Sequence, residues 1–147
     1  IKCAIGKMGL TKKKIEGDLK TPKGCFNFKV LYYRADRIKK VDTQIKKVKI
    51  RKNFGWCDDP SSNKYNKLVL FPFKKSAEKL YLKENIYDLI LVINYNLKPI
   101  IKNKGSAIFL HLASKKLTPT RGCIAIKKKK LLSILPLITN KTKLFIN

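Results

Sequence analysis

One histidine and one of four cysteines stand at a spacing that suits a thiol nucleophile. His111 lies at the end of an apolar run, and Cys123 follows twelve positions later, after a loop rich in turn-forming residues. A catalytic cysteine needs a base or an imidazolium within hydrogen-bond reach to form the thiolate. The pair therefore favours acyl transfer, although a single histidine on an apolar strand is more often structural.

The two residues before the cysteine fit the same chemistry. Gly122 lets the chain turn sharply and approach a substrate closely. Backbone N–H groups at such a turn can point at a developing oxyanion. Arg121 adds positive charge beside the thiol, which we expect to lower the pKa of Cys123. The predicted catalytic set is therefore Cys123, His111, Gly122 and Arg121.

Other site chemistries find little support in the chain. The remaining cysteines, Cys3, Cys25 and Cys57, are scattered rather than grouped as zinc ligands. No glycine-rich phosphate loop and no serine nucleophile elbow is present. We therefore expect no metal and no organic cofactor. Cys3 and Cys57 remain a candidate disulfide if the compartment is oxidising.

The charge of the chain admits two explanations. The formal net charge is +26, from 35 Lys and Arg residues against nine Asp and Glu residues. A basic chain usually suggests a polyanionic partner. Almost all the cations are Lys, however, and Lys, Ile and Asn all have A/T-rich codons, so a biased genome could produce this composition. Nucleic-acid readers lean on Arg, and we expect no specific nucleic-acid binding.

Length and patterning indicate a single mainly β domain over residues 1–147. No stretch approaches the roughly 18 apolar residues that span a membrane. The chain starts at Ile1 without Met or a signal region, so we expect a processed form or an N-terminally truncated fragment. Short, punctuated apolar runs predict strands. They lie at Lys2–Ile5, Cys25–Tyr32, Ile45–Ile50, Lys67–Phe71, Tyr87–Tyr95, Ser106–Leu112, Cys123–Ile126 and Lys143–Ile146.

Two short helices are predicted. Ser76 could cap a helix that runs to about Lys83. The second helix, from Lys127 to Leu135, places its leucines on one face. We find no internal repeat and no flexible linker.

Several motifs in order resemble the L,D-transpeptidase catalytic domain family, also called YkuD-like. His111 and the segment Thr118–Ile126, with its Pro-Thr-Arg-Gly-Cys-Ile, resemble the family's catalytic signature. Ile15–Phe26 resembles its Glu-Gly-Asp-x-x-Thr-Pro-x-Gly-x-Phe segment, and Gly55–Pro60 resembles a short-spacer branch. The resemblance covers nearly the whole chain and implies a mixed β-sandwich with one or two short helices.

The sequence departs from the family pattern beside the nucleophile. Arg121 stands where the usual signature has a second His, and Ala125 replaces the usual Arg after Gly-Cys-Ile. The spacer between His111 and Cys123 is shorter than in commoner members. The nucleophile and the base are retained, whereas the usual substrate contacts are in question.

The resemblance implies peptidoglycan stem peptides as substrates and a bacterial periplasmic or cell-envelope location. It implies that Cys123 forms a thioester with a tetrapeptide stem, that an amine resolves it, and that a carbapenem also acylates the thiol. Arg121, Tyr65, Trp56 and Asp18 are the candidate substrate-binding residues. Trp56 could equally be a core anchor, and Asp18 could simply bond backbone N–H groups in its turn. We expect a monomer.

Two alternatives stay open. If water resolves the thioester, the chain is an L,D-carboxypeptidase. If the substitution at Arg121 removes activity, the chain is a non-catalytic, lysine-rich module that binds the wall or another polyanion.

Overall fold

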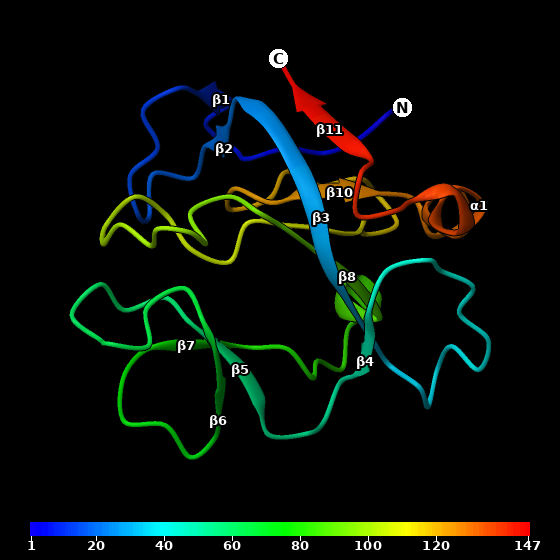
Figure 1. The fold of residues 1–147 in the computed structure, drawn as a ribbon, viewed down its shortest axis with the longest axis horizontal. Helices are drawn as coiled ribbons and strands as arrows, with labels where there is room; N and C mark the ends of the chain where they lie inside the picture. The colour runs from blue at the N-terminus through cyan, green and yellow to red at the C-terminus, as the bar shows by residue number, and fades with distance from the viewer.

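The structure, a computed structural model that describes residues 1–147, is built mainly from β-strands in two larger sheets (Figure 1). The first sheet has the strand order β10-β9-β8-β3-β11, and β4 also pairs with β3. Its strands are β3 (Gly24–Tyr33), β4 (Lys47–Lys49), β8 (Leu89–Ile93), β9 (Phe109–Leu112), β10 (Ile124–Ile126) and β11 (Lys143–Ile146). This main sheet is mixed, because β10 runs parallel to β9 whereas β8 is antiparallel to both β9 and β3.

A smaller antiparallel sheet has the order β6-β5-β7. Its strands are β5 (Phe54–Cys57), β6 (Leu68–Leu70) and β7 (Ala77–Lys79). Near the N-terminus, β1 (Leu10–Thr11) pairs in parallel with β2 (Thr21–Pro22). The small sheet lies below the main sheet in Figure 1, and aromatic side chains of β5 fill the space between the two.

Alternation along the strands divides the main sheet into two different faces. Leu110 and Leu112 of β9 and Ile124 and Ile126 of β10 join one core that is mainly aliphatic. The residues between them point the other way, because successive side chains of a strand alternate between faces. We call the first face the helix face, since Leu131 of α1 packs there. The second is the cavity face.

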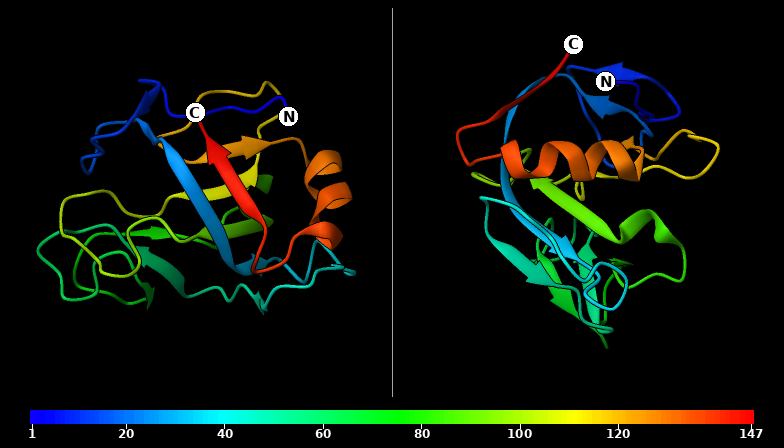
Figure 2. Two further views of the ribbon diagram at one scale, coloured as in Figure 1. Left: turned by 45° about the horizontal axis from the view of Figure 1, so that its top comes forward. Right: turned by 90° about the vertical axis from the view of Figure 1, so that its right-hand side faces the viewer.

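Packing rather than capping holds the single α-helix. Helix α1 (Lys128–Ile134) has no side-chain cap at Lys127, and the lysines of its first turn oppose the helix dipole. A seven-residue helix is marginal by itself. Figure 2 shows the helix beside the main sheet, and Leu131 is fully buried in the core between them. The chain then continues into a 3₁₀ turn, η2 (Leu135–Leu137).

Most of the predicted elements are confirmed. The mainly β class, the C-terminal strand and the Lys127–Leu135 helix agree with the structure within one or two residues. Predicted strands over Cys25–Tyr32, Tyr87–Tyr95 and Cys123–Ile126 correspond to β3, β8 and β10. The first residue of the Tyr87–Tyr95 prediction, Tyr87, belongs instead to a 3₁₀ turn, η1 (Asn85–Tyr87).

The predicted helix from Ser76 to Lys83 is wrong. Ala77, Glu78 and Lys79 form β7 and pair with β5, a strand that the sequence analysis missed. Ala, Glu and Lys favour helices, but intrinsic propensity is weak and pairing with a buried partner strand overrides it. At the N-terminus, the predicted strand Lys2–Ile5 is reduced to a bridge between Ala4 and Ala125.

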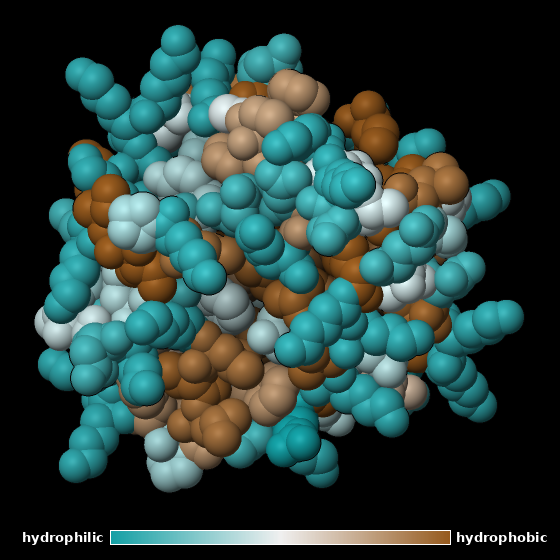
Figure 3. Space-filling view, in the orientation of Figure 1, coloured by the Kyte–Doolittle hydropathy of each residue, from teal (hydrophilic) through white to brown (hydrophobic).

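The exterior is covered by hydrophilic side chains. Figure 3 shows long hydrophilic side chains projecting around the molecule, with apolar surface confined to smaller areas between them. None of the helices is both long and apolar enough to cross a membrane. Every cysteine is a free thiol, with Cys3 exposed and Cys57 buried, so the candidate Cys3–Cys57 disulfide is absent from this structure.

Candidate active site

The thiol of Cys123 lies in the wall of a cavity of about 480 Å³ on the cavity face of the main sheet. Its Sγ donates a hydrogen bond to the carbonyl oxygen of Ala107 (3.0 Å) and accepts one from the N–H of Phe109 (3.3 Å). The residue is 8% exposed. The thiol is therefore held from two sides by the backbone that leads into β9.

The surroundings of Cys123 favour its neutral form. Burial raises the pKa of the Cys123 thiol, and the negative charge of Glu78 raises it further. The N–H of Phe109 and the charge of Lys14 act in the opposite direction without outweighing burial. The expectation that Arg121 lowers this pKa is therefore wrong for the resting structure. Arg121 lines the cavity, but the charges that act on the thiol are those of Glu78 and Lys14.

His111 reaches the same cavity from β9. It pairs with Ala125 of β10, and paired residues of adjacent strands share a face, as do residues two apart along a strand. Cys123 and His111 therefore both point to the cavity face, and both line the cavity. No hydrogen bond joins them in the resting structure, where the thiol bonds to Ala107 instead.

The imidazole is fixed in one tautomer. Nδ1 of His111 lies 2.9 Å from the carbonyl oxygen of Leu112, and a carbonyl can only accept. Nδ1 therefore carries the proton, and Nε2 keeps the lone pair of a base. Burial lowers the pKa of His111, although hydrogen bonds to the backbone of Leu112 and Ile86 act to raise it. The ring also packs edge-on against Tyr87, with ring centroids 5.1 Å apart.

Gly122 is required by both backbone conformation and space. Its φ is +141°, which L side chains rarely adopt. A Cβ at this position would lie 3.0 Å from the carbonyl oxygen of Lys20 and 3.3 Å from a methyl group of Ile108. The glycine therefore lets the loop before Cys123 press against the segment that leads into β2.

Two threonines fix the loop around the nucleophile. Thr120 Oγ1 accepts from the N–H of Gly122 (3.1 Å) and donates to the carbonyl oxygen of Cys123 (2.6 Å). Thr21 Oγ1 donates to the carbonyl oxygen of Gly122 (2.8 Å). The N–H of Gly122 is thus already bonded, whereas the N–H of Cys123 has no protein acceptor.

Trp56 and Tyr65 support the site without lining the cavity. Trp56 Nε1 donates to Asn66 Oδ1 (2.9 Å), which also accepts from the N–H of Ala107 (3.1 Å). The hydroxyl of Tyr65 accepts from the N–H of Gly105 (3.0 Å). Both aromatic residues are buried. They hold the loop whose carbonyl oxygen at Ala107 accepts the hydrogen bond of the Cys123 thiol.

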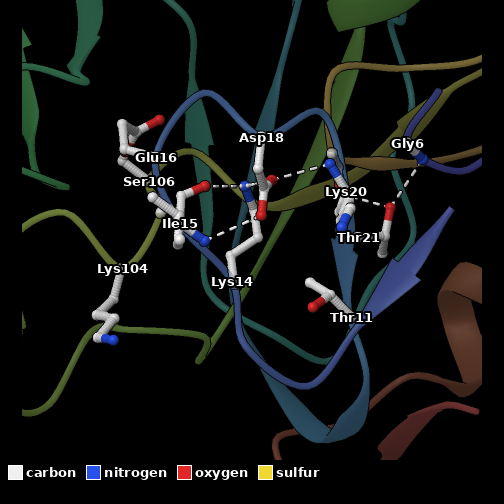
Figure 4. A network of polar contacts seen from close by, with 12 residues as sticks. Gly6, Thr11, Lys14, Ile15, Glu16, Asp18, Lys20, Thr21, Lys104 and Ser106 are labelled. Atoms are coloured by element: carbon white, nitrogen blue, oxygen red, sulfur yellow. Dashed lines mark hydrogen bonds and ion pairs between the residues drawn. The ribbon is translucent and has the colours of Figure 1, made fainter. Parts of the chain in front are cut away.

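Asp18 organises a turn, with its carboxylate between Lys14, Ile15 and Lys20 (Figure 4), and it does not line the cavity. Its carboxylate accepts from the N–H groups of Ile15 and Lys20, both at 2.9 Å, and pairs with the buried Lys14 at 2.5 Å. Burial acts to raise the pKa of Asp18, but these hydrogen bonds outweigh it and lower the pKa. The carboxylate is already fully engaged by the protein.

The family model for the YkuD L,D-transpeptidase catalytic domain matches residues 1–146. This chain belongs to that family. Members of the family act on cell-wall peptidoglycan. No curated protein and no solved structure matches the chain.

Several residues of this L,D-transpeptidase domain escaped the sequence analysis. Glu16, Asp58, Glu78 and Tyr87 line the cavity with the thiol. Glu16 stands inside the Glu-Gly-Asp segment, so that motif was the available signal. No sequence signal points to Glu78, because the sequence favours a helix there and only the pairing of β7 with β5 brings this side chain to the cavity.

The domain shows no group of three or more His, Cys, Asp or Glu side chains that could hold a metal ion. The cavity does hold charges of both signs, because Lys14 and Arg121 line it together with the carboxylates. It therefore offers a nucleophile, a neutral base, a free backbone N–H at Cys123 and separate contacts for anionic and cationic groups.

Proposed function

We propose that the chain is a cysteine-dependent L,D-transpeptidase that forms a thioester with a peptidoglycan tetrapeptide stem. The observation that carries the proposal is the shared cavity of Cys123 and His111, each pointing from neighbouring strands of one sheet face. Family membership supports the substrate class.

Before acylation, the thiol of Cys123 and the imidazole of His111 are both uncharged. Nε2 of His111 takes the proton of the Cys123 thiol, and Sγ bonds to the carbonyl carbon of the residue that precedes the terminal D-Ala. The imidazolium then gives this proton to the leaving amine nitrogen as the C–N bond breaks. The products are free D-Ala and a thioester on Cys123. A substrate that excludes water and moves the thiol toward His111 would release Sγ from Ala107.

The oxyanion of the tetrahedral intermediate needs a nearby donor. The backbone N–H of Cys123 is free of protein acceptors and is our candidate. Gly122 contributes through its conformation, since its own N–H is bonded to Thr120. Arg121 is exposed at the cavity and is our candidate for binding a stem carboxylate.

Deacylation completes the cycle. An amine attacks the thioester carbonyl carbon, the C–S bond breaks and Cys123 recovers its proton, which yields a crosslink when the amine belongs to a second stem. Water in place of the amine makes the protein an L,D-carboxypeptidase. We further infer a cell-envelope location, a monomeric enzyme and acylation by carbapenems, with no metal or organic cofactor required.

Intact-mass spectrometry tests the proposal directly. The protein is incubated with a tetrapeptide-stem muropeptide, or with a carbapenem, and compared with Cys123→Ala. We expect a mass increase equal to the acyl group on the wild type and none on the variant. An unmodified wild-type protein with both reagents would contradict the proposal. Salt-sensitive binding to an anionic polymer, unaffected by Cys123→Ala, would then favour the lysine-rich binding module.

A further inference from the structure

The cavity gathers negative charge inside a strongly basic protein. Of the nine acidic residues in the chain, Glu16, Asp58 and Glu78 line the cavity of Cys123. The three salt bridges of the structure use Asp18, Asp36 and Asp88 instead. The cavity carboxylates therefore lack an ion-pair partner, although the chain carries 35 Lys and Arg residues.

Two buried tyrosines hold two of these carboxylates in place. Tyr65, which is 2% exposed, donates to Glu16 Oε2 at 2.5 Å, and Ser106 Oγ donates to the same oxygen at 2.7 Å. Tyr87, which is 4% exposed, donates to Glu78 Oε1 at 2.6 Å. In each case one oxygen is fixed, and the other has no protein partner.

A third carboxylate oxygen at the cavity is both buried and unsatisfied. Asp58 Oδ1 is the one buried side-chain polar atom in the structure without a hydrogen-bond partner. Buried acceptors of this kind are rare in proteins and costly unless a ligand or water satisfies them. Together with the free oxygens of Glu16 and Glu78, it marks this side of the cavity as a place for a hydrogen-bond donor with positive charge.

The cations of the protein do not fill this place. Lys14 is bonded to Asp18, and Arg121 makes no salt bridge. Burial raises the pKa of Glu78, and the charge of Arg121 acts at longer range to lower it. The carboxylates also do not form a group that could hold a metal ion. A primary ammonium group suits them better, because it carries three N–H donors and can engage carboxylates singly.

We propose that Glu16 and Glu78 position the acyl acceptor by binding its primary ammonium group. This proposal rests on the proposed function and deepens it, because it names the residues that hold the amine acceptor. Nε2 of His111, which is neutral after acylation, takes one proton from the bound ammonium, and the resulting amine attacks the thioester carbonyl carbon in the same cavity.

The test measures ammonium binding without any turnover. Nα-acetyl-lysinamide, which carries one primary ammonium and no carboxylate, is titrated into ¹⁵N-labelled wild-type protein, with Nα-acetyl-norleucinamide as the uncharged control. We expect shifts at cavity residues with the lysine compound only. Glu16→Gln and Glu78→Gln should each weaken this binding about tenfold, since each removes a charge-assisted hydrogen bond.

Glu84→Gln is the matched control, because it makes the same change at an exposed carboxylate outside the cavity. The same spectra show whether each variant is folded. Equal binding of the two compounds, or equal weakening by all three variants, would overturn the proposal. Since neither compound is an acyl donor, this failure is separate from a failure to form the Cys123 thioester.

Discussion

The two faces of the main sheet differ in the kind of side chain they carry. The helix face is mainly aliphatic, and its core includes Leu110, Leu112, Ile124 and Ile126 together with Leu131 of α1. The cavity face alternates with it along the same strands and carries aromatic residues together with the thiol and the imidazole. One sheet thus separates stability from chemistry by the period-two alternation of its strands.

The two faces also treat polar groups differently. The helix-face core consists of hydrophobic side chains. On the cavity face, Tyr87 packs against His111 and donates to Glu78, and Trp56 donates to Asn66. Buried polar groups need partners, so this face must be held by a hydrogen-bonded network as well as by packing. Substitutions on the helix face should therefore lower stability, whereas substitutions on the cavity face should slow the proposed acylation.

The largest expected effect on chemistry is at His111. We expect His111→Gln to reduce the rate of Cys123 acylation by about 10²–10⁴-fold, because the base that takes the thiol proton is lost. The measurement is the time course of adduct formation by intact mass. Near-normal acylation in this variant would contradict the role of His111 as the base that takes the thiol proton.

Leu131→Ala should destabilise the core on the helix face without changing the cavity. Leu131 is fully buried, and we expect the free energy of unfolding to fall by about 2–5 kcal/mol in urea titrations. Acylation measured per folded molecule should stay near the wild-type rate, because no cavity contact changes. A loss of acylation comparable with that of His111→Gln would refute the separation of the two faces.

Gly122→Ala tests the loop that joins the nucleophile to the sheet. The left-handed φ of +141° and the close carbonyl oxygen of Lys20 should together cost about 1–3 kcal/mol of stability. Acylation should also slow, because the thiol and its N–H are displaced.

Gly9→Ala is the control for backbone strain, because Gly9 has a φ of +81° and an added methyl group there would meet nothing within 4 Å. It should lose stability without slowing acylation. If both variants slow acylation equally, the close packing at Gly122 is not the cause.

The smallest effect concerns the reactivity of the resting thiol. Because burial raises the pKa of Cys123, its thiolate fraction is low at neutral pH and grows as the pH rises. We expect iodoacetamide to label the exposed Cys3 and Cys25 at least about tenfold faster than Cys123 at pH 7, and the ratio to fall only once the pH exceeds the ordinary thiol pKa of about 8.5. Peptide mapping by mass spectrometry measures this. Fastest labelling at Cys123 would indicate a preformed thiolate.

The proposed catalytic pair, Cys123 and His111, and most of the strands leave local signals in the sequence. Alternating or continuous apolar runs specify β3, β8 and β10, and Gly122 with Cys123 lies in a recognisable turn. The small sheet was harder. Its strands β5 and β7 are short, and β7 consists of residues that favour helices, so only their mutual pairing makes them strands.

Substrate-side residues were the least readable. Trp56, Tyr65 and Asp18 were candidates for substrate contact, with a structural role left open for Trp56 and Asp18, and none of the three lines the cavity. Their hydrogen bonds run to partners distant in sequence or within a turn. The cavity carboxylate of Glu78 went unnoticed for the same reason, because its neighbours in space come from other strands.

The sequence by itself determined the family and the mainly β class, and it predicted Cys123 and His111 as nucleophile and base, because residue type and order carry that information. Only the tertiary structure decided the state of the site. Burial of Cys123 and His111 makes both neutral at rest, and strand pairing brings unpaired carboxylates into a cavity within a protein of charge +26. Desolvation and pairing depend on which distant segments meet, which no local pattern encodes.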